Sequence, residues 1–131
     1  IGIVIVAHGG LAREYLSAVE HVVGIQPGIV AVAIEAEHDR DRKQAEICTA
    51  ADDVDAGDGV VVVTDLYGGS PSNLSMRACQ PENRRILYGM NLPMLIKLAK
   101  SRQMAVPDAV KGALEAGRKY IDSVNVKPDP Q

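Results

Sequence analysis

The sequence predicts an α/β fold in which a mainly parallel, four-stranded sheet is covered by helices on both faces. Three β-branched runs carry this prediction: residues 1–7, 29–34 and 59–64 are rich in Val and Ile on both alternating faces, as is typical of strands buried in a parallel sheet. Apolar residues at helical spacing separate the runs. Strand–helix–strand units with right-handed crossovers build a three-layer domain, and the expected strand order is 2-1-3-4.

The first two helices are predicted from the spacing of apolar residues between the strands. The first runs from Leu11 to Gly24, because a glycine suits the position just beyond a helix. Its buried face is expected to hold Leu11, Tyr15, Ala18, Val19, Val22 and Val23. The second ends near Gly57, and its face is expected to hold Gln44, Ile47, Cys48, Ala51 and Val54.

The second half of the chain continues the alternation. A short helix is predicted over residues 70–79 and a fourth strand over residues 85–89. Pro93 and Pro107 each suit the first turn of a further helix. The last helix is expected to bury Val110, Leu114, Gly117 and Ile121. Residues 123–127 alternate like a short strand, and residues 127–131 are interpreted as a flexible tail on a single domain that spans residues 1–131.

Composition narrows the class of protein. The 131 residues are 47% hydrophobic and 24% charged, which fits one globular domain and excludes disorder by composition. The net charge is −3 and no basic run occurs, so nucleic acid is not an expected partner. No apolar stretch approaches the ~20 residues of a transmembrane helix, so membrane insertion is not expected. Cys48 and Cys79 lie in no metal-ligand spacing and are interpreted as reduced, buried residues of a cytoplasmic protein.

The candidate catalytic residues are His8 and Asp65. Each directly follows a predicted strand, and strands one and three are neighbours in the expected order. The carboxyl ends of parallel strands form the edge where α/β proteins bind ligands. A carboxylate that accepts from one ring N–H fixes the tautomer and leaves the other nitrogen as a nucleophile. The alternative is that His8 caps its strand and Asp65 caps a turn.

Small residues beside these two predict an anion cradle. Gly9 and Gly10 precede the first helix, so their backbone N–H groups are expected to approach a ligand. Gly69 and Ser70 open the short helix, with Ser70 expected to be its N-cap. A histidine nucleophile in an anion-binding pocket suggests phosphoryl acceptance. The alternative is that Gly68 and Gly69 form an ordinary loop.

Other polar residues are given structural interpretations. His21 is expected to be partly buried, and His38 to be solvated in a charged loop that reaches the rim of the site. The arginines at positions 77, 84 and 85 are interpreted as a surface patch. No P-loop motif occurs, which argues against ATP as a direct donor, and no second carboxylate accompanies Asp65 at a metal-binding spacing. No cofactor or metal is expected.

Three segments resemble the enzyme IIA domain of the mannose-type phosphotransferase system. They are IVAHG at residues 5–9, TDLYGGSPSN at residues 64–73 and GMNLPML at residues 89–95. The resemblance covers the chain in order. The subunit of dihydroxyacetone kinase that shares the His-Gly start matches the second segment less well.

The resemblance implies a phosphotransferase that works through phosphohistidine. His8 would take a phosphoryl group from the phosphocarrier HPr and pass it to a histidine of a IIB protein or domain, Asp65 would orient His8, and Ser70 would lie in the pocket. It also implies a cytoplasmic homodimer that exchanges a C-terminal antiparallel strand. This chain differs at Gly10-Leu11, and its 131 residues hold no IIB domain. The tail at residues 127–131 is interpreted either as a natural end or as a cut linker.

Two other functions remain open from sequence alone. One is a regulatory phosphoprotein whose phosphorylation state controls partner binding without sugar transport. The other is a small-anion-binding domain without phosphoryl transfer, which the three segments disfavour. The sugar and the phosphoryl acceptor are not indicated by the sequence.

Overall fold

The computed structural model describes residues 1–127 as an α/β fold with an all-parallel sheet in the order β2-β1-β3-β4. The predicted fold class and strand order are confirmed. The strands are β1 (Gly2–His8), β2 (Ile29–Ile34), β3 (Val60–Thr64) and β4 (Arg84–Leu87). The helices are α1 (Leu11–Val23), α2 (Arg40–Val54), α3 (Ser70–Ser75), α4 (Leu92–Ala99) and α5 (Val106–Lys119), with a 3-10 turn η1 (Arg77–Cys79).

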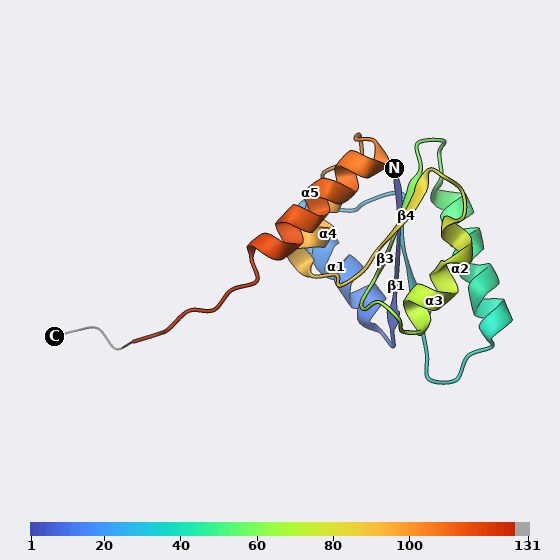
Figure 1. Ribbon diagram of the computed structural model, residues 1–131, viewed down its shortest axis with the longest axis horizontal. Coiled ribbons are helices and arrows are strands. Elements are labelled where there is room, and N and C mark those ends of the chain that lie inside the picture. Colours follow the sequence, from blue (N-terminus) through green and yellow to red (C-terminus); the bar gives the residue numbers. More distant parts are fainter. Residues whose placement is uncertain (128–131) are drawn as a thin grey trace.

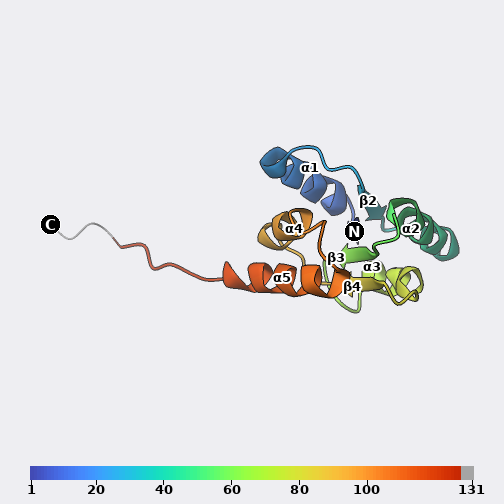
Figure 2. The same cartoon turned by 90° about the horizontal axis from the view of Figure 1, so that it is seen from above.

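The helices form two layers around the sheet. Figure 2 shows α1, α4 and α5 on one side of the strands and α2 and α3 on the other. Alternate residues of β1 supply the two cores: Ile3 and Ile5 face the α1–α4–α5 layer, whereas Val4 and Val6 face the α2–α3 layer. Burying one such side chain contributes about 1.5–3 kcal/mol. This two-sided burial is why the strands carry β-branched residues on both faces.

The central strands deliver their carboxyl ends to one edge of the sheet. β1 lies between β2 and β3, with His8 opposite Ile34 and Val6 opposite Thr64. In Figure 1, β1 descends from the N-terminus to the lower edge, where α1 begins. The segments that follow β1 and β3 therefore meet at this edge.

Several predicted boundaries are corrected. His8 is the last residue of β1 rather than the first after it, and the helix predicted over residues 70–79 is divided between α3 and η1. β4 ends at Leu87. The last helix ends at Lys119, two residues before Ile121. The predicted burial of Ile121 is wrong, because this residue is 72% exposed.

The surface of α1 also differs from expectation. Leu11, Val22 and His21 are exposed, whereas Ala12 and Val19 are buried. Residues two apart on a helix do not share a face, so His21 lies away from the stripe that contains Val19.

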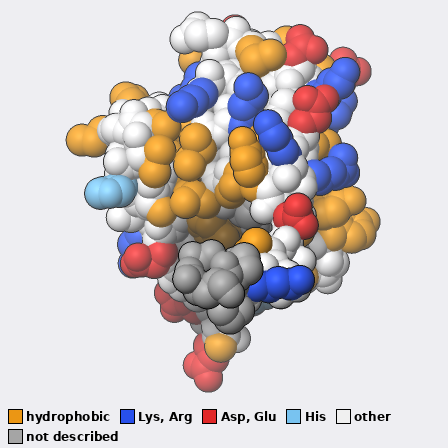
Figure 3. Space-filling view, turned by 90° about the vertical axis from the view of Figure 1, so that its left-hand side faces the viewer, with side chains coloured by type: hydrophobic (Ala, Val, Ile, Leu, Met, Phe, Trp, Pro, Cys, Tyr) orange, Lys and Arg blue, Asp and Glu red, His pale blue; other side chains and the backbone are white. Residues whose placement is uncertain are grey.

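Figure 3 shows hydrophobic side chains, with Lys and Arg around them, gathered on the face from which the C-terminal segment emerges.

The described part of the C-terminal segment, up to residue 127, forms no strand in the single chain. Residues 121–127 adopt neither helix nor strand and are exposed. The predicted tail at residues 127–131 lies, apart from Lys127, outside the described residues. Cys48 and Cys79 are free thiols of intermediate exposure. Burial raises the pKa of Cys79 to about 11, which keeps this thiol protonated at neutral pH.

Candidate functional site

His8 sits at the junction of a rigid strand and an open edge. The other residues of β1, from Gly2 to Ala7, are all buried, which fixes the backbone that carries His8. The His8 side chain itself is 51% exposed. The imidazole is therefore held firmly at its base while its ring is accessible to another molecule.

Asp65 lies against His8, as the strand order predicts. Oδ2 of Asp65 is 2.7 Å from Nδ1 of His8 and 3.1 Å from the backbone nitrogen of the same residue. The backbone N–H of Leu66 donates to Oδ1 at 2.9 Å. Both carboxylate oxygens are thus engaged, and the Asp65 side chain is only 12% exposed.

These contacts determine the protonation state of the pair. Burial alone would raise the pKa of Asp65, but hydrogen bonds from the ring and backbone of His8 and from Leu66 bring that pKa below its usual value. An ionised carboxylate only accepts hydrogen bonds. Nδ1 of His8 therefore carries the proton, and Nε2 has no hydrogen-bond partner among residues 1–127.

Gly9 and Gly10 form the turn between β1 and α1. Gly9 has φ +56°, a conformation that favours glycine, and its N–H donates to the carbonyl of Ile34 at 2.9 Å. The amide of Gly9 is therefore used in the sheet rather than offered to a ligand. Gly10 is the N-cap of α1, which has 13 residues and presents the positive end of its dipole directly after the histidine turn.

The glycine loop before α3 passes close to the ring. A Cβ on Gly69 would lie 3.4 Å from Cε1 of His8 and 2.9 Å from Cδ1 of Leu66, so a larger residue here would make the Leu66 or the His8 side chain shift. Gly69, not Ser70, is the N-cap of α3, and no side chain within residues 1–127 caps this helix. The prediction of Ser70 as the N-cap is wrong, although Ser70 does lie at the start of the helix.

The serine that holds this loop is Ser72, which the sequence interpretation did not single out. Its side-chain oxygen accepts from the N–H of Gly68 at 2.9 Å and donates to the carbonyl of Gly69 at 3.1 Å. Ser72 is fully buried. The available signal was a serine three to four residues beyond a glycine pair, a spacing typical of side-chain bonds to the backbone of a turn.

The remaining polar candidates lie elsewhere or differ from expectation. His38 bonds the carbonyl of Glu35 through Nδ1 at 2.9 Å and is half-buried. Arg84 does not belong to a surface patch, because its side chain is 8% exposed and pairs with Asp52 and Asp55.

Within residues 1–127, no group of three or more His, Cys, Asp and Glu side chains is placed to hold a metal ion. No helix in this part of the chain has the length and apolar character needed to cross a membrane.

Fold and site together define an α/β protein with an exposed histidine, oriented by a carboxylate, at the carboxyl edge of a parallel sheet. The chain belongs to the EIIA-man family, which is described as the PTS system fructose IIA component, where PTS stands for phosphotransferase system. The family model matches residues 2–115. The resemblance to a mannose-type IIA domain is confirmed by this match.

Known proteins similar to this chain agree with the assignment. The mannose-specific EIIAB component of the phosphotransferase system from Escherichia coli K12 is 27% identical over 131 residues, which cover 98% of this chain and 41% of that protein. The chain thus spans less than half the length of this curated relative.

Two solved structures match this chain over nearly the whole length of both proteins. The mannose/sorbose-specific IIA subunit from Enterococcus faecalis has a TM-score of 0.86 and 25% identity, with 98% of each chain covered. The EIIA component from Streptococcus agalactiae has a TM-score of 0.83 and 28% identity, covering 93% of this chain and 95% of that chain.

Proposed function

We propose that this protein is a phosphohistidine carrier that accepts a phosphoryl group from HPr on Nε2 of His8 and passes it to a IIB histidine during sugar uptake. The observation that carries the proposal is the 2.7 Å contact between Nδ1 of His8 and Asp65, because it leaves the Nε2 lone pair available on an accessible ring. Family membership supports the same reaction class.

The transfer step follows from the protonation state of the pair. The bond that joins the phosphoryl group to HPr breaks, with its electron pair left on HPr, as a phosphorus–nitrogen bond forms at Nε2 of His8. His8 keeps its Nδ1 proton, so the phosphorylated ring is cationic, and the adjacent Asp65 carboxylate stabilises that charge. The bond between phosphorus and Nε2 then breaks as the IIB histidine forms a bond to phosphorus, and Nε2 regains its lone pair.

The surroundings suit the incoming anion. The first backbone N–H groups of α1 have no partners within the helix, and the dipole of α1 favours negative charge at this end. We expect Gly10 to contribute here, with Gly69 and Ser70 on the opposite side of the ring. α3 has only six residues, so its dipole is the weaker of the two.

The experiment is incubation with phosphoenolpyruvate, enzyme I and HPr, followed by intact-mass measurement and mapping of the modified residue. The expected result is one acid-labile, alkali-stable phosphoryl group on His8 and none on His8→Gln. Wild-type uptake by the His8→Gln variant would overturn the assignment. Loss of the group on addition of a mannose-type IIB protein supports transport, and its retention favours the regulatory function.

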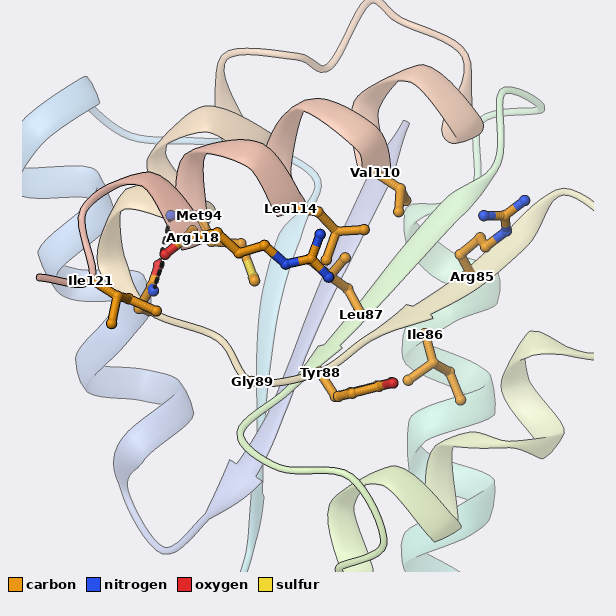
Figure 4. A pocket seen from close by; sticks show the side chains of 12 residues that line it. Arg85, Ile86, Leu87, Tyr88, Gly89, Met94, Val110, Leu114, Arg118 and Ile121 are labelled. Carbon is orange, nitrogen blue, oxygen red and sulfur yellow. Dashed lines mark hydrogen bonds between the residues drawn. The ribbon is translucent and has the colours of Figure 1, made fainter.

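We further propose that the carrier is a cytoplasmic homodimer in which residues 123–127 of one copy add to β4 of the other. Among residues 1–127, β4 pairs with β3 alone, so its outer edge is open in this part of the chain. Figure 4 shows Leu87, Val110 and Leu114 beside this edge, in a pocket of about 300 Å³. Val124 and Val126 are 82% and 84% exposed, and an added strand would cover both them and the open edge.

A further inference from the structure

Two buried serines on α3 make different kinds of hydrogen bond. Ser72 accepts from Gly68 and donates to Gly69, so its bonds reach back into the loop that precedes the helix. Ser75 donates to the carbonyl of Pro71 at 2.6 Å, which lies within the helix. Both side chains are fully buried. The two serines therefore share the same helix and the same burial, and they differ only in the backbone groups that their hydroxyls bind.

The loop that Ser72 holds lies against the reactive ring. Gly68 has φ +87°, and Gly69 passes so close that a Cβ there would be 3.4 Å from Cε1 of His8. Cε1 is the ring atom between Nδ1 and Nε2. Asp65 binds the imidazole at Nδ1, and Gly69 lies near the ring on the side of Cε1.

We propose that Ser72 is a positioning residue for phosphoryl transfer: its hydroxyl fixes Gly68 and Gly69, and Gly69 in turn keeps the His8 ring aligned for attack through Nε2. This inference rests on the proposed function. Without the hydroxyl, the Gly68 N–H loses its acceptor, and the Gly69 carbonyl keeps only the N–H of Asn73, at 3.0 Å, as a donor. The segment Gly68–Gly69 is then held by Asn73 alone, through bonds to the two carbonyls, and moves more freely. The ring therefore spends less time in the productive orientation.

The test compares Ser72→Ala with the matched control Ser75→Ala in the full chain. Phosphoryl acceptance from phospho-HPr is measured as kcat and KM, and hydrogen exchange of the Gly68 amide is followed by NMR. Ser72→Ala is expected to lower kcat about tenfold, equivalent to about 1.4 kcal/mol of activation free energy. KM is expected to stay unchanged, because Ser72 is fully buried and takes no part in the surface that a partner protein can touch. Gly68 exchange is expected to accelerate in this variant alone.

Ser75→Ala is expected to keep kcat within about twofold of wild type, because it removes a buried hydroxyl without releasing the loop. Equal kcat for the two variants, or a change confined to KM, overturns the inference. If Ser72→Ala does not fold, Ser72→Thr decides, because it retains a hydroxyl and is expected to preserve kcat within about threefold. A slow Ser72→Thr protein with a protected Gly68 amide overturns the inference. A wild-type chain that takes no phosphoryl group on His8 instead overturns the proposed function.

Discussion

Oδ2 of Asp65 lies 2.7 Å from Nδ1 of His8, although 57 residues separate the two in the chain. The contact exists because β1 and β3 are adjacent and parallel, so the residues at their carboxyl ends meet at one edge. The same oxygen also accepts from the backbone of His8 at 3.1 Å. The carboxylate is thereby fixed to the strand as well as to the ring.

Asp65→Asn is expected to slow phosphoryl transfer by roughly 10²–10⁴-fold, the scale of other carboxylate–histidine pairs. An amide keeps the shape of the side chain but removes the charge, and its NH₂ group can donate to Nδ1 and select the wrong tautomer. The measurement is the rate of phosphoryl acceptance from phospho-HPr, with circular dichroism to confirm folding. A rate within about twofold of wild type would show that the contact between Asp65 and His8 does not contribute to phosphoryl transfer.

Gly69→Ala tests the other side of the ring. The added methyl group would lie 2.9 Å from Cδ1 of Leu66 and 3.4 Å from Cε1 of His8, so one of the two side chains must shift. Gly69 has φ −86°, so alanine meets no backbone strain there. We expect about a tenfold lower rate of phosphoryl acceptance with little loss of stability. The control is Gly112→Ala in α5, since a Cβ there lies 3.4 Å from the side-chain Cε of Lys97 and far from the site.

The sequence predicted the sheet well because burial on both faces leaves a clear mark. Residues of β3 from Val60 to Thr64 are all buried, and only β-branched residues occur there. The pairing of His8 with Asp65 then followed from strand order. Topology and composition thus sufficed for the part of the site that the backbone determines.

The finer contacts depended on side-chain directions that composition does not encode. Ser70 and Ser72 are equivalent as serines near a glycine pair, and only the geometry of the loop selects Ser72 as its partner. Ile121 matches the helical spacing of Val110 and Gly117, but the chain leaves the helix after Lys119 and the spacing no longer applies. Arg84 follows a loop, and its sequence position predicts exposure. The structure buries it because it pairs with Asp52 and Asp55, which are distant in sequence and leave no local signal.

Removal of residues 122–131 tests the proposed exchange of C-terminal segments. If residues 123–127 pair with β4 of a second copy, the shortened chain loses the contact that joins the dimer, and sedimentation is expected to show monomers. The intact chain is expected to be dimeric at concentrations on the order of tens of micromolar. A monomeric intact chain under the same conditions contradicts the exchange. Val124→Lys, which places a charge in the pairing segment, is expected to weaken the dimer without shortening the chain.

Thr64→Val is expected to stabilise the protein. Thr64 is fully buried at the end of β3, and its hydroxyl has no hydrogen-bond partner among residues 1–127. Strand alternation places it on the same face as Val62, against the α2–α3 layer. Valine has nearly the same shape without the unsatisfied group, so the free energy of unfolding is expected to rise by about 1 kcal/mol. Urea unfolding measures this gain, and the reverse change Val62→Thr is expected to lower stability by a similar amount.

Arg84→Leu is expected to destabilise the protein in a pH-dependent manner. Nη2 of Arg84 donates to Asp52 at 2.8 Å and to Asp55 at 3.1 Å, and Nη1 donates to the carbonyl of Ala78 at 3.0 Å. Leucine leaves the mostly buried Asp55 carboxylate and the Ala78 carbonyl without this donor. We expect a loss of about 2–3 kcal/mol in the free energy of unfolding at neutral pH.

The pH dependence follows from Asp55. The Gly57 N–H is the largest cause that holds its pKa below the usual value; burial opposes this, and Arg84 adds to the lowering. A carboxyl group with a lowered folded pKa stabilises the protein above its unfolded pKa, near 3.9, and that contribution is lost as pH falls through the folded pKa. Arg84→Leu removes part of the lowering, so its deficit relative to wild type is expected to shrink from about pH 5 downward. Urea unfolding across this range measures the difference, with the exposed neighbour Arg85→Leu as control. A deficit that stays constant as Asp55 protonates would contradict the role of this ion pair, because a packing loss at position 84 has no reason to vary with pH.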